Sequence, residues 1–326
     1  MMRMPSFELR TPRSVEEAAA ILGESPADTM LLAGGTDLVP NMKRRQQTPR
    51  VVVALRQLRE LRAIGHNGAL TIGAAATLTD VVRDARLRET CPGLWEAAAQ
   101  IATPHLRNMG TIGGNLCLDT RCTYYDQSHE WRKAIGFCMK KDGATCWVAT
   151  SSPKCLAVSS TDTAPMLQAL GATVTLVSAR GTRTLAVADL FNNDGMEYLT
   201  RRPDEILTAV TVPDQTGWRS TYVKLRRRGS FDFPVASVAA AVRLAGDGSV
   251  AEARVVLGAV ASRPLTSVKA AGLIVGRRLT PDVIAEAADA AYEIAKPMDN
   301  TDFDLIWRKR MVRRLVSDAL QRLSAI

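Results

Sequence analysis

Four cysteines lie close together in one stretch of the chain, at Cys122, Cys138, Cys146 and Cys155. The stretch runs from about residue 119 to 160 and shows little amphipathic period, so it needs a cross-link or a metal to become ordered. Thiolates are the soft ligands that iron and zinc prefer. Successive cysteines are separated by 15, 7 and 8 residues, without the close pairs of ferredoxins or zinc ribbons. The spacing alone therefore leaves an iron–sulfur cluster and a zinc site equally open.

The compartment bears on whether these thiols would form disulfides. The N-terminus lacks the apolar core of a signal peptide, and no run of about 18 apolar residues could span a bilayer. We therefore expect a cytoplasmic protein, in which metal binding is favoured over disulfides. The other two cysteines, Cys91 and Cys117, are interpreted as small buried apolar residues, although Cys117 is close enough to the stretch to be a rival ligand.

Two glycine turns could hold a nucleotide. The first lies in the run Leu31-Leu32-Ala33-Gly34-Gly35-Thr36-Asp37-Leu38, at the end of a buried strand, where missing Cβ atoms let backbone N–H groups approach a pyrophosphate. The second is Thr111-Ile112-Gly113-Gly114-Asn115, seven residues before Cys122, and its Thr111 and Asn115 side chains could bond phosphate or ribityl oxygens. Neither is a G-x-G-x-x-G or P-loop motif, so a plain tight turn remains the alternative for each.

The periodicity predicts three domains and an α+β fold. Residues 1–56 contain a helix opened by a capping box at Ser14 and two strands, at 30–33 and 50–55. Residues 57–216 contain a strand at 69–73, helices at 79–85, 93–102 and 163–170, and a hairpin through 179–182. Residues 217–326 contain a hairpin of 235–244 and 250–260, followed by helices at 265–275, 281–295 and 304–323.

Charge and catalytic motifs exclude several classes of function. The chain carries 42 Lys and Arg against 33 Asp and Glu, but only 5% aromatic residues and no basic segment interleaved with them, so nucleic-acid binding is not expected. The three histidines show no metal-binding spacing, and no Gly-x-Ser-x-Gly elbow occurs. No residue is predicted to be catalytic within this chain.

At these motifs the sequence resembles the FAD-binding medium subunits of the molybdenum hydroxylases, the xanthine dehydrogenase and carbon monoxide dehydrogenase group. The likeness rests on the runs at 31–38 and 111–116, on Ser160-Thr161-Asp162-Thr163-Ala164-Pro165, on Asp204-Glu205-Ile206-Leu207 and on Tyr222-Val223-Lys224. It implies two α/β-type FAD-binding subdomains followed by a C-terminal α+β domain. It also implies that both glycine turns cradle the FAD diphosphate, that Asp162 binds the ribityl chain, and that Ile206 and Lys224 approach the flavin. Ala102, at the end of the helix before the second turn, completes the expected cofactor-binding set.

One departure from that family concerns the cysteine stretch. Family members pass from the Gly-Gly-Asn turn to the Ser-Asp motif within a few residues, whereas 46 positions separate Asn115 from Thr161 here. The insertion is similar to that of the β subunits of 4-hydroxybenzoyl-CoA reductases, which binds a [4Fe–4S] cluster. By this resemblance Cys122, Cys138, Cys146 and Cys155 are the cluster ligands. The implied partners are a large molybdopterin-binding subunit and a small [2Fe–2S] subunit, and the implied reaction is reductive removal of a phenolic hydroxyl, giving benzoyl-CoA, in anaerobic aromatic degradation.

Two other functions stay open. One is an FAD subunit of an oxidising hydroxylase that passes electrons to NAD. The other is a non-redox nucleotide-binding protein with a structural zinc site.

The charge of the cysteine stretch suggests an electron donor. Between residues 121 and 155 six basic residues face three acidic ones, a local charge of +3. The basic residues are Arg121, Arg132, Lys133, Lys140, Lys141 and Lys154. An acidic donor such as ferredoxin should be steered to this surface.

Overall fold

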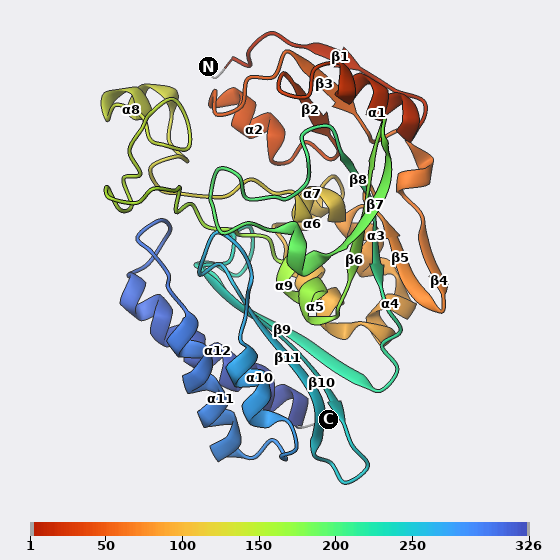
Figure 1. Cartoon of the computed structure of the whole chain (residues 1–326), viewed down its shortest axis with the longest axis vertical. Coiled ribbons are helices and arrows are strands. Elements are labelled where there is room, and N and C mark those ends of the chain that lie inside the picture. The colour runs from red at the N-terminus through yellow and green to blue at the C-terminus, as the bar shows by residue number, and fades with distance from the viewer. Residues whose placement is uncertain (1–2, 325–326) are drawn as a thin grey trace.

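The computed structural model describes residues 3–324, which form three sheets and the helices around them (Figure 1). The N-terminal sheet has the order β1-β3-β2, formed in parallel by Glu8–Arg10, Val51–Ala54 and Thr29–Leu32. Helix α1, Val15–Glu24, packs on it, and α2, Leu38–Lys43, follows the first glycine turn. The hydroxyl of Ser14 accepts a hydrogen bond from the Glu17 amide at 3.2 Å. The Glu17 carboxylate, however, accepts a hydrogen bond from the Arg13 amide and not from the Ser14 amide, as a capping box requires. Only half of the predicted capping box is therefore formed.

The middle sheet is antiparallel, in the order β4-β5-β8-β6-β7. Its strands are Ile64–Asn67, Ala69–Gly73, Ile206–Val212, Thr173–Ser178 and Gly181–Ala186, and the predicted hairpin is confirmed between the last two. Its helices are α3 (Leu78–Arg83), α4 (Ala85–Thr90), α5 (Pro92–Ala99), α6 (Pro104–Arg107), α7 (Ile112–Leu116) and α9 (Thr163–Ala169). Short 3-10 turns occupy Arg59–Leu61 and Val187–Leu190.

The C-terminal sheet has the order β12-β11-β10-β9, formed by Leu265–Thr266, Val250–Gly258, Ala236–Leu244 and Trp218–Leu225. Helices α10 (Val268–Ile274), α11 (Pro281–Ile294) and α12 (Leu305–Ser324) lie along one face, while α5 and α9 contact the other. Strand β10 is apolar from Val238 to Val242 because both of its faces are buried. Ala239 and Ala241 enter the middle core, while Val238 and Ala240 face the C-terminal helices. The helix predicted from residue 265 begins at 268, because the first residues extend the sheet.

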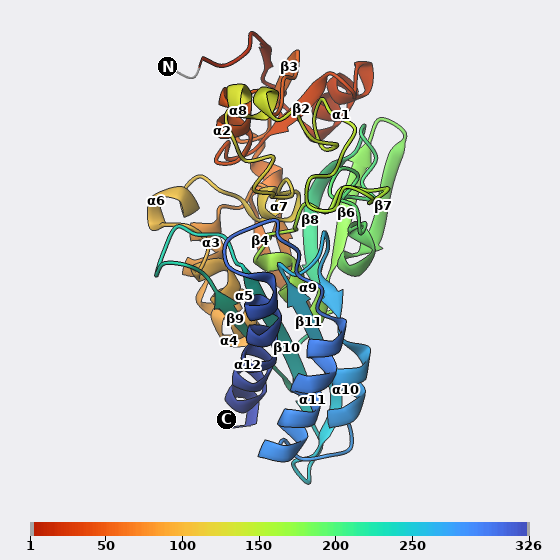
Figure 2. The ribbon, with the colours of Figure 1, turned by 90° about the vertical axis from the view of Figure 1, so that its left-hand side faces the viewer.

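The three sheets, with their helices, follow one another along the molecule. In Figure 2 the N-terminal elements lie at one end, the C-terminal helices at the other, and the middle sheet between them. The three sheets draw their strands from residues 8–54, 64–212 and 218–266, and the domain boundaries near 56 and 216 stay a prediction. Within residues 3–324, none of the helices combines the length and the apolar composition that a membrane span requires.

The cysteine stretch projects between the two ends, beside α2 and above the start of α12 (Figure 1). It is mostly irregular, with one short helix, α8, His129–Ala134. Its base is closed by a pair of backbone hydrogen bonds between Arg121 and Val158, at 2.8 and 2.7 Å. The Asn300 carbonyl accepts the Thr123 amide, and the Asn300 side chain donates to the Leu156 carbonyl, so the C-terminal part of the chain also holds the stretch.

Candidate cofactor site

A cavity of about 630 Å³ lies where the two glycine turns, the cysteine stretch and two C-terminal loops meet. The loops are residues 231–235, before β10, and 300–302, before α12. Elements far apart in the sequence therefore build its wall. The size is within the range of sites that enclose a cofactor.

The first glycine turn presents unused donors to this cavity. The backbone N–H groups of Gly34, Gly35, Thr36 and Asp37 have no acceptor among residues 3–324. Gly35 has a φ of 74°, a conformation that side chains with a Cβ rarely adopt. A Cβ at Gly34 would overlap the Met109 carbonyl. The turn therefore needs both glycines, and its amides can bind an anion such as a diphosphate.

The second glycine turn does not offer such a cradle, contrary to the sequence-based expectation. The amides of its residues 112–115 are all used within the protein. Their acceptors are, in order, the Ala76 carbonyl, the Ala74 carbonyl, the Thr111 hydroxyl and the Thr111 carbonyl, at 2.9–3.1 Å. A Cβ at Gly113 would lie 2.7 Å from that of Ala74, so this glycine allows close packing against the strand end.

The Thr111 and Asn115 side chains of this turn still line the cavity, and Asn115 is oriented by its neighbours. Its Oδ1 accepts from the Thr161 hydroxyl and from both the hydroxyl and the amide of Thr163, at 2.7–3.1 Å. The Thr163 amide can only donate, so it identifies the oxygen end of the Asn115 side chain. The Nδ2 group is left to donate to a ligand.

Asp162 and Lys224 meet, as a cofactor site would require, but only Asp162 lines the cavity. Their ion pair measures 2.9 Å, with Lys224 fully buried, and the Tyr222 hydroxyl donates to Asp162 at 2.8 Å. Burial raises the pKa of the Asp162 carboxyl, while Lys224 and Tyr222 oppose that rise. The carboxylate is thus oriented before any ligand binds.

Ile206 is not brought to the cavity. It is fully buried against α1, in a core with Val15 and Leu22. Successive side chains of a strand point to opposite faces, so Ile206 faces α1 while Leu207 faces the middle core.

The residues predicted to bind the cofactor divide into two groups. Those on the cavity wall are Leu31, Ala33, Gly34, Gly35, Thr36, Asp37, Leu38, Ala102, Thr111, Gly114, Asn115 and Asp162, whereas Leu32, Ile112, Gly113, Ile206 and Lys224 lie behind it.

Several wall residues were not predicted. Asp119, Tyr198, Phe233 and Asn300 carry no local motif that would have indicated them, whereas Ser160 belongs to the run from Ser160 to Pro165 in which only Asp162 was predicted to bind the cofactor. Arg121, counted only as a surface charge, forms ion pairs with Asp37 of the first turn and with Asp126, and its guanidinium stacks on Phe233 at 4.5 Å. Burial by itself would lower the pKa of Arg121, but the nearby carboxylates of Asp37, Asp126 and Asp119 outweigh it, so the pKa is raised. Arg121 ties the base of the cysteine stretch to the cofactor turn.

The four cysteines of the stretch are 4–6% exposed and belong to one neighbourhood. Cys122, Cys138 and Cys155 share a buried cluster with Tyr125 and Ala157. Burial raises the pKa of Cys122 to about 12 and that of Cys155 to about 11, and the neighbouring thiols, Cys146 among them, add to the rise. Such thiols become thiolates only with a compensating positive charge, which a metal centre supplies.

The surroundings of Cys155 suit a metal-bound sulfur. The Ala157 amide donates to its Sγ at 3.5 Å, and a Cβ on Gly195 would lie 2.7 Å from the same atom. Amide donors of this kind stabilise the thiolates that bind an iron–sulfur cluster and influence the reduction potential of that cluster.

The two remaining cysteines lie apart from these four. Cys91 is part of the middle core, and Cys117 packs against that core. Among residues 3–324, no three His, Cys, Asp or Glu side chains are grouped closely enough for a single metal ion.

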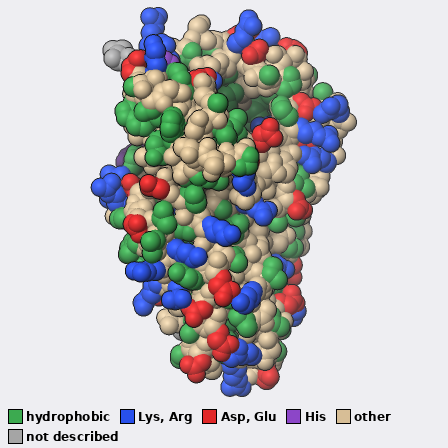
Figure 3. All heavy atoms as spheres, turned by 60° about the vertical axis from the view of Figure 1, so that its left-hand side comes forward, with side chains coloured by type: hydrophobic (Ala, Val, Ile, Leu, Met, Phe, Trp, Pro, Cys, Tyr) green, Lys and Arg blue, Asp and Glu red, His purple; other side chains and the backbone are tan. Residues whose placement is uncertain are grey.

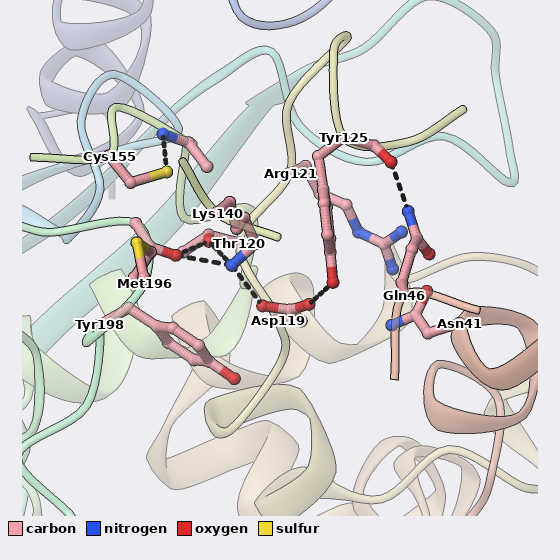
Figure 4. Close-up of polar contacts among 12 residues, drawn as sticks. Asn41, Gln46, Asp119, Thr120, Arg121, Tyr125, Lys140, Cys155, Met196 and Tyr198 are labelled. Atoms are coloured by element: carbon pink, nitrogen blue, oxygen red, sulfur yellow. Dashed lines mark hydrogen bonds and ion pairs between the residues drawn. The ribbon is translucent and has the colours of Figure 1, made fainter. Parts of the chain in front are cut away.

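The basic surface expected on the stretch is smaller than its sequence suggests. Lys140 is 6% exposed at its side chain and its ammonium group points inward to Asp119, Thr120 and Gly195 (Figure 4). Arg132 is also buried. On the face in Figure 3, Lys and Arg side chains are spread out and mixed with Asp and Glu. The predicted role of Lys140 in steering a donor is therefore wrong, because its ammonium group is buried and does not reach the surface.

Comparison with known proteins identifies the fold. A family model described as the FAD binding domain in molybdopterin dehydrogenase matches residues 5–215, and the CO dehydrogenase flavoprotein C-terminal domain matches residues 220–323. The chain belongs to the FAD-binding subunits of molybdopterin dehydrogenases. As an FAD-binding subunit it is an oxidoreductase component, and the predicted fold is confirmed.

Several relatives match this FAD-binding subunit over nearly its whole length. The carbon monoxide dehydrogenase medium chain of Hydrogenophaga pseudoflava is 29% identical, over 97% of this chain and 96% of the relative. The aldehyde oxidoreductase FAD-binding subunit of Escherichia coli (strain K12) is 30% identical, over 97% and 99%. The structure of reconstituted CO dehydrogenase from Oligotropha carboxidovorans matches with a TM-score of 0.81 and 28% identity, covering 99% of both chains.

Proposed function

We propose that this FAD-binding subunit also carries a [4Fe–4S] cluster on Cys122, Cys138, Cys146 and Cys155. We further propose that it transfers electrons within a molybdenum enzyme of the 4-hydroxybenzoyl-CoA reductase type. The observation that carries the proposal is the position of the four buried thiols. They lie on a stretch whose base, from Asp119 to Asp126, forms part of the wall of the cofactor cavity.

FAD would be held by groups that the cavity wall already orients. The free amides at Gly34–Asp37 would donate to the diphosphate, which is the most negative part of the molecule. Asp162, held by Tyr222 and Lys224, would accept from ribityl hydroxyls, and the Nδ2 of Asn115 would donate to the same chain. Bound flavin exchanges one or two electrons, and the protein adjusts its potential through burial and hydrogen bonds.

The cluster would be held by four buried thiolates, of which Cys122, Cys138 and Cys155 belong to one apolar cluster, with the Ala157 amide donating to Cys155. An iron–sulfur cluster supplies one-electron transfer when bound. The residues of this chain exclude water from the thiols and fix the stretch against the cavity through Arg121 and Asp37. The four cysteines do not line the cavity themselves, but Asp119, Arg121, Thr123 and Asp126 of the same stretch do, so a cluster on these cysteines would lie on a segment that contacts the cofactor cavity.

The partners and the substrate follow from the same reasoning. The relatives are named as medium chains or FAD subunits of larger enzymes. We accordingly propose a large molybdopterin-binding subunit, a small [2Fe–2S] subunit and, as external donor, ferredoxin. The names of three relatives refer to carbon monoxide, nicotinate and aldehydes. The cysteine-bearing insertion is what favours reductive removal of a phenolic hydroxyl from an aromatic CoA thioester.

The first experiment is an absorption spectrum of the purified chain together with iron and acid-labile sulfide analysis. Flavin bands with a broad visible shoulder, and about four iron and four sulfide per chain, are expected for the proposed cluster. Flavin bands without iron would indicate an oxidising hydroxylase subunit. A colourless, zinc-loaded protein would indicate the non-redox alternative.

The second experiment concerns the substrate. The assembled complex, supplied with reduced ferredoxin and 4-hydroxybenzoyl-CoA, should release benzoyl-CoA, measured by chromatography. The matched control replaces ferredoxin with NAD and tests for an oxidised product. NAD-dependent oxidation without any reduction of the thioester would contradict the reductase assignment.

A further inference from the structure

Lys140 is buried, which is unusual for a lysine on an irregular segment of the chain. It follows Cys138 by two residues, yet its side chain is only 6% exposed. Its ammonium group donates to Asp119 Oδ1 at 2.8 Å, Thr120 Oγ1 at 2.8 Å and the Gly195 carbonyl at 2.6 Å. All three donor positions of the ammonium are used.

The three acceptors belong to different parts of the cofactor region. Asp119 lines the cavity, and its second carboxylate oxygen accepts from the Tyr125 hydroxyl and from Gln47, which follows α2. Gly195 belongs to the segment that packs on Cys155, and its amide donates to the Cys155 carbonyl at 2.9 Å. One ammonium group therefore joins the cysteine loop, the cavity wall and the neighbour of Cys155 (Figure 4).

Aromatic rings complete the enclosure. The Lys140 ammonium lies 5.0 Å from the ring centroid of Tyr125 and 5.3 Å from that of Tyr198, within the range of cation–π attraction. A buried ammonium is costly unless it is paired and fully hydrogen-bonded, and here it is both. Solubility cannot explain such a residue, because its charge does not reach the solvent.

We propose that Lys140 is a positioning residue that locks the cysteine stretch onto the wall of the FAD cavity and places a fixed positive charge beside Cys155. The inference rests on the proposed cluster. Reduction adds negative charge to a cluster, and a nearby cation in a low-dielectric setting stabilises that state. Lys140 should therefore raise the reduction potential of the cluster and hold its ligands in one orientation relative to FAD.

The test uses Lys140→Met, which keeps the length of the side chain and removes its charge, and Lys140→Arg, which keeps the charge. Lys141→Met is the matched control, because the neighbouring lysine is 32% exposed and its one ion-pair partner within residues 3–324 is Asp142. The cluster potential is measured by a redox titration followed by electron paramagnetic resonance. Hydrogen exchange of residues 119–126 is measured in the same proteins, with and without iron.

Lys140→Met should lower the cluster potential and speed exchange at residues 119–126, whereas Lys140→Arg should restore the potential at least in part and Lys141→Met should match the wild type. An unchanged potential in Lys140→Met, with the cluster present, would overturn the electrostatic role. Unchanged exchange would overturn the locking role. If the wild type holds no iron, the proposed function fails, and exchange in the iron-free proteins still decides whether Lys140 locks the stretch.

Discussion

Removing Lys224 should be far more costly than removing an exposed lysine. Lys224 and Asp162 are 0% and 3% exposed at their side chains, and the ammonium lies 2.9 Å from the carboxylate. In Lys224→Met the carboxylate would stay buried, and the Tyr222 hydroxyl would be its one remaining hydrogen-bond donor among the described residues, 3–324. Leaving one member of a buried ion pair uncompensated costs about 3–5 kcal/mol. We expect that loss in the free energy of unfolding near pH 7.

The loss should depend on pH in a defined direction. Burial already raises the pKa of Asp162, and removing Lys224 removes the largest opposing influence, so the pKa rises further. A carboxyl that binds its proton more tightly in the folded than in the unfolded protein makes the free energy of unfolding fall as the pH rises above about 3.9. The variant should therefore be closest to the wild type at acidic pH and furthest from it near neutrality.

The assay is urea unfolding of flavin-free protein, followed by tryptophan fluorescence, at several pH values. Lys269→Met is the matched control, since Lys269 forms an ion pair with Glu293 at an exposed site and should change stability by less than about 1 kcal/mol. The double variant Lys224→Met/Asp162→Asn removes both charges and should recover part of the loss. A Lys224→Met protein within about 1 kcal/mol of the wild type at pH 7 would refute the reasoning.

Three further predictions concern the cofactors. Cys122→Ser should lower iron and sulfide content, since a hydroxyl is a poorer ligand for iron, whereas Cys117→Ser should retain both; the reverse result in elemental analysis would show that the ligand set is wrong. Gly34→Ala should lose FAD, measured by flavin fluorescence after gel filtration, because its Cβ would overlap the Met109 carbonyl, and full retention would contradict the turn's role. Charge reversal at Lys133 and Lys141 should slow reduction of the complex by ferredoxin at low salt as much as high salt does; stopped-flow rates indifferent to both would remove the steering hypothesis.

The sequence by itself determined the features that depend on neighbouring residues. The N-cap at Ser14, the hairpin of β6 and β7 and the positive φ of Gly35 in the first turn are all local, because backbone conformation and short-range hydrogen bonds decide them. The family and its FAD cofactor were recognisable from motifs of this kind. The four cysteines were also visible as a group, although their spacing alone did not choose between iron–sulfur and zinc.

Only the tertiary structure decided which predicted residues reach the cavity. Ile206 packs against α1, and the Ile112 and Gly113 amides donate to the Ala76 and Ala74 carbonyls, because contacts between distant segments determine which way each group faces. Lys140 looks like a surface charge in the sequence, yet its partners Asp119 and Gly195 are 21 and 55 positions away. Burial and ion pairing depend on contacts between distant segments, and no local pattern of residues encodes them.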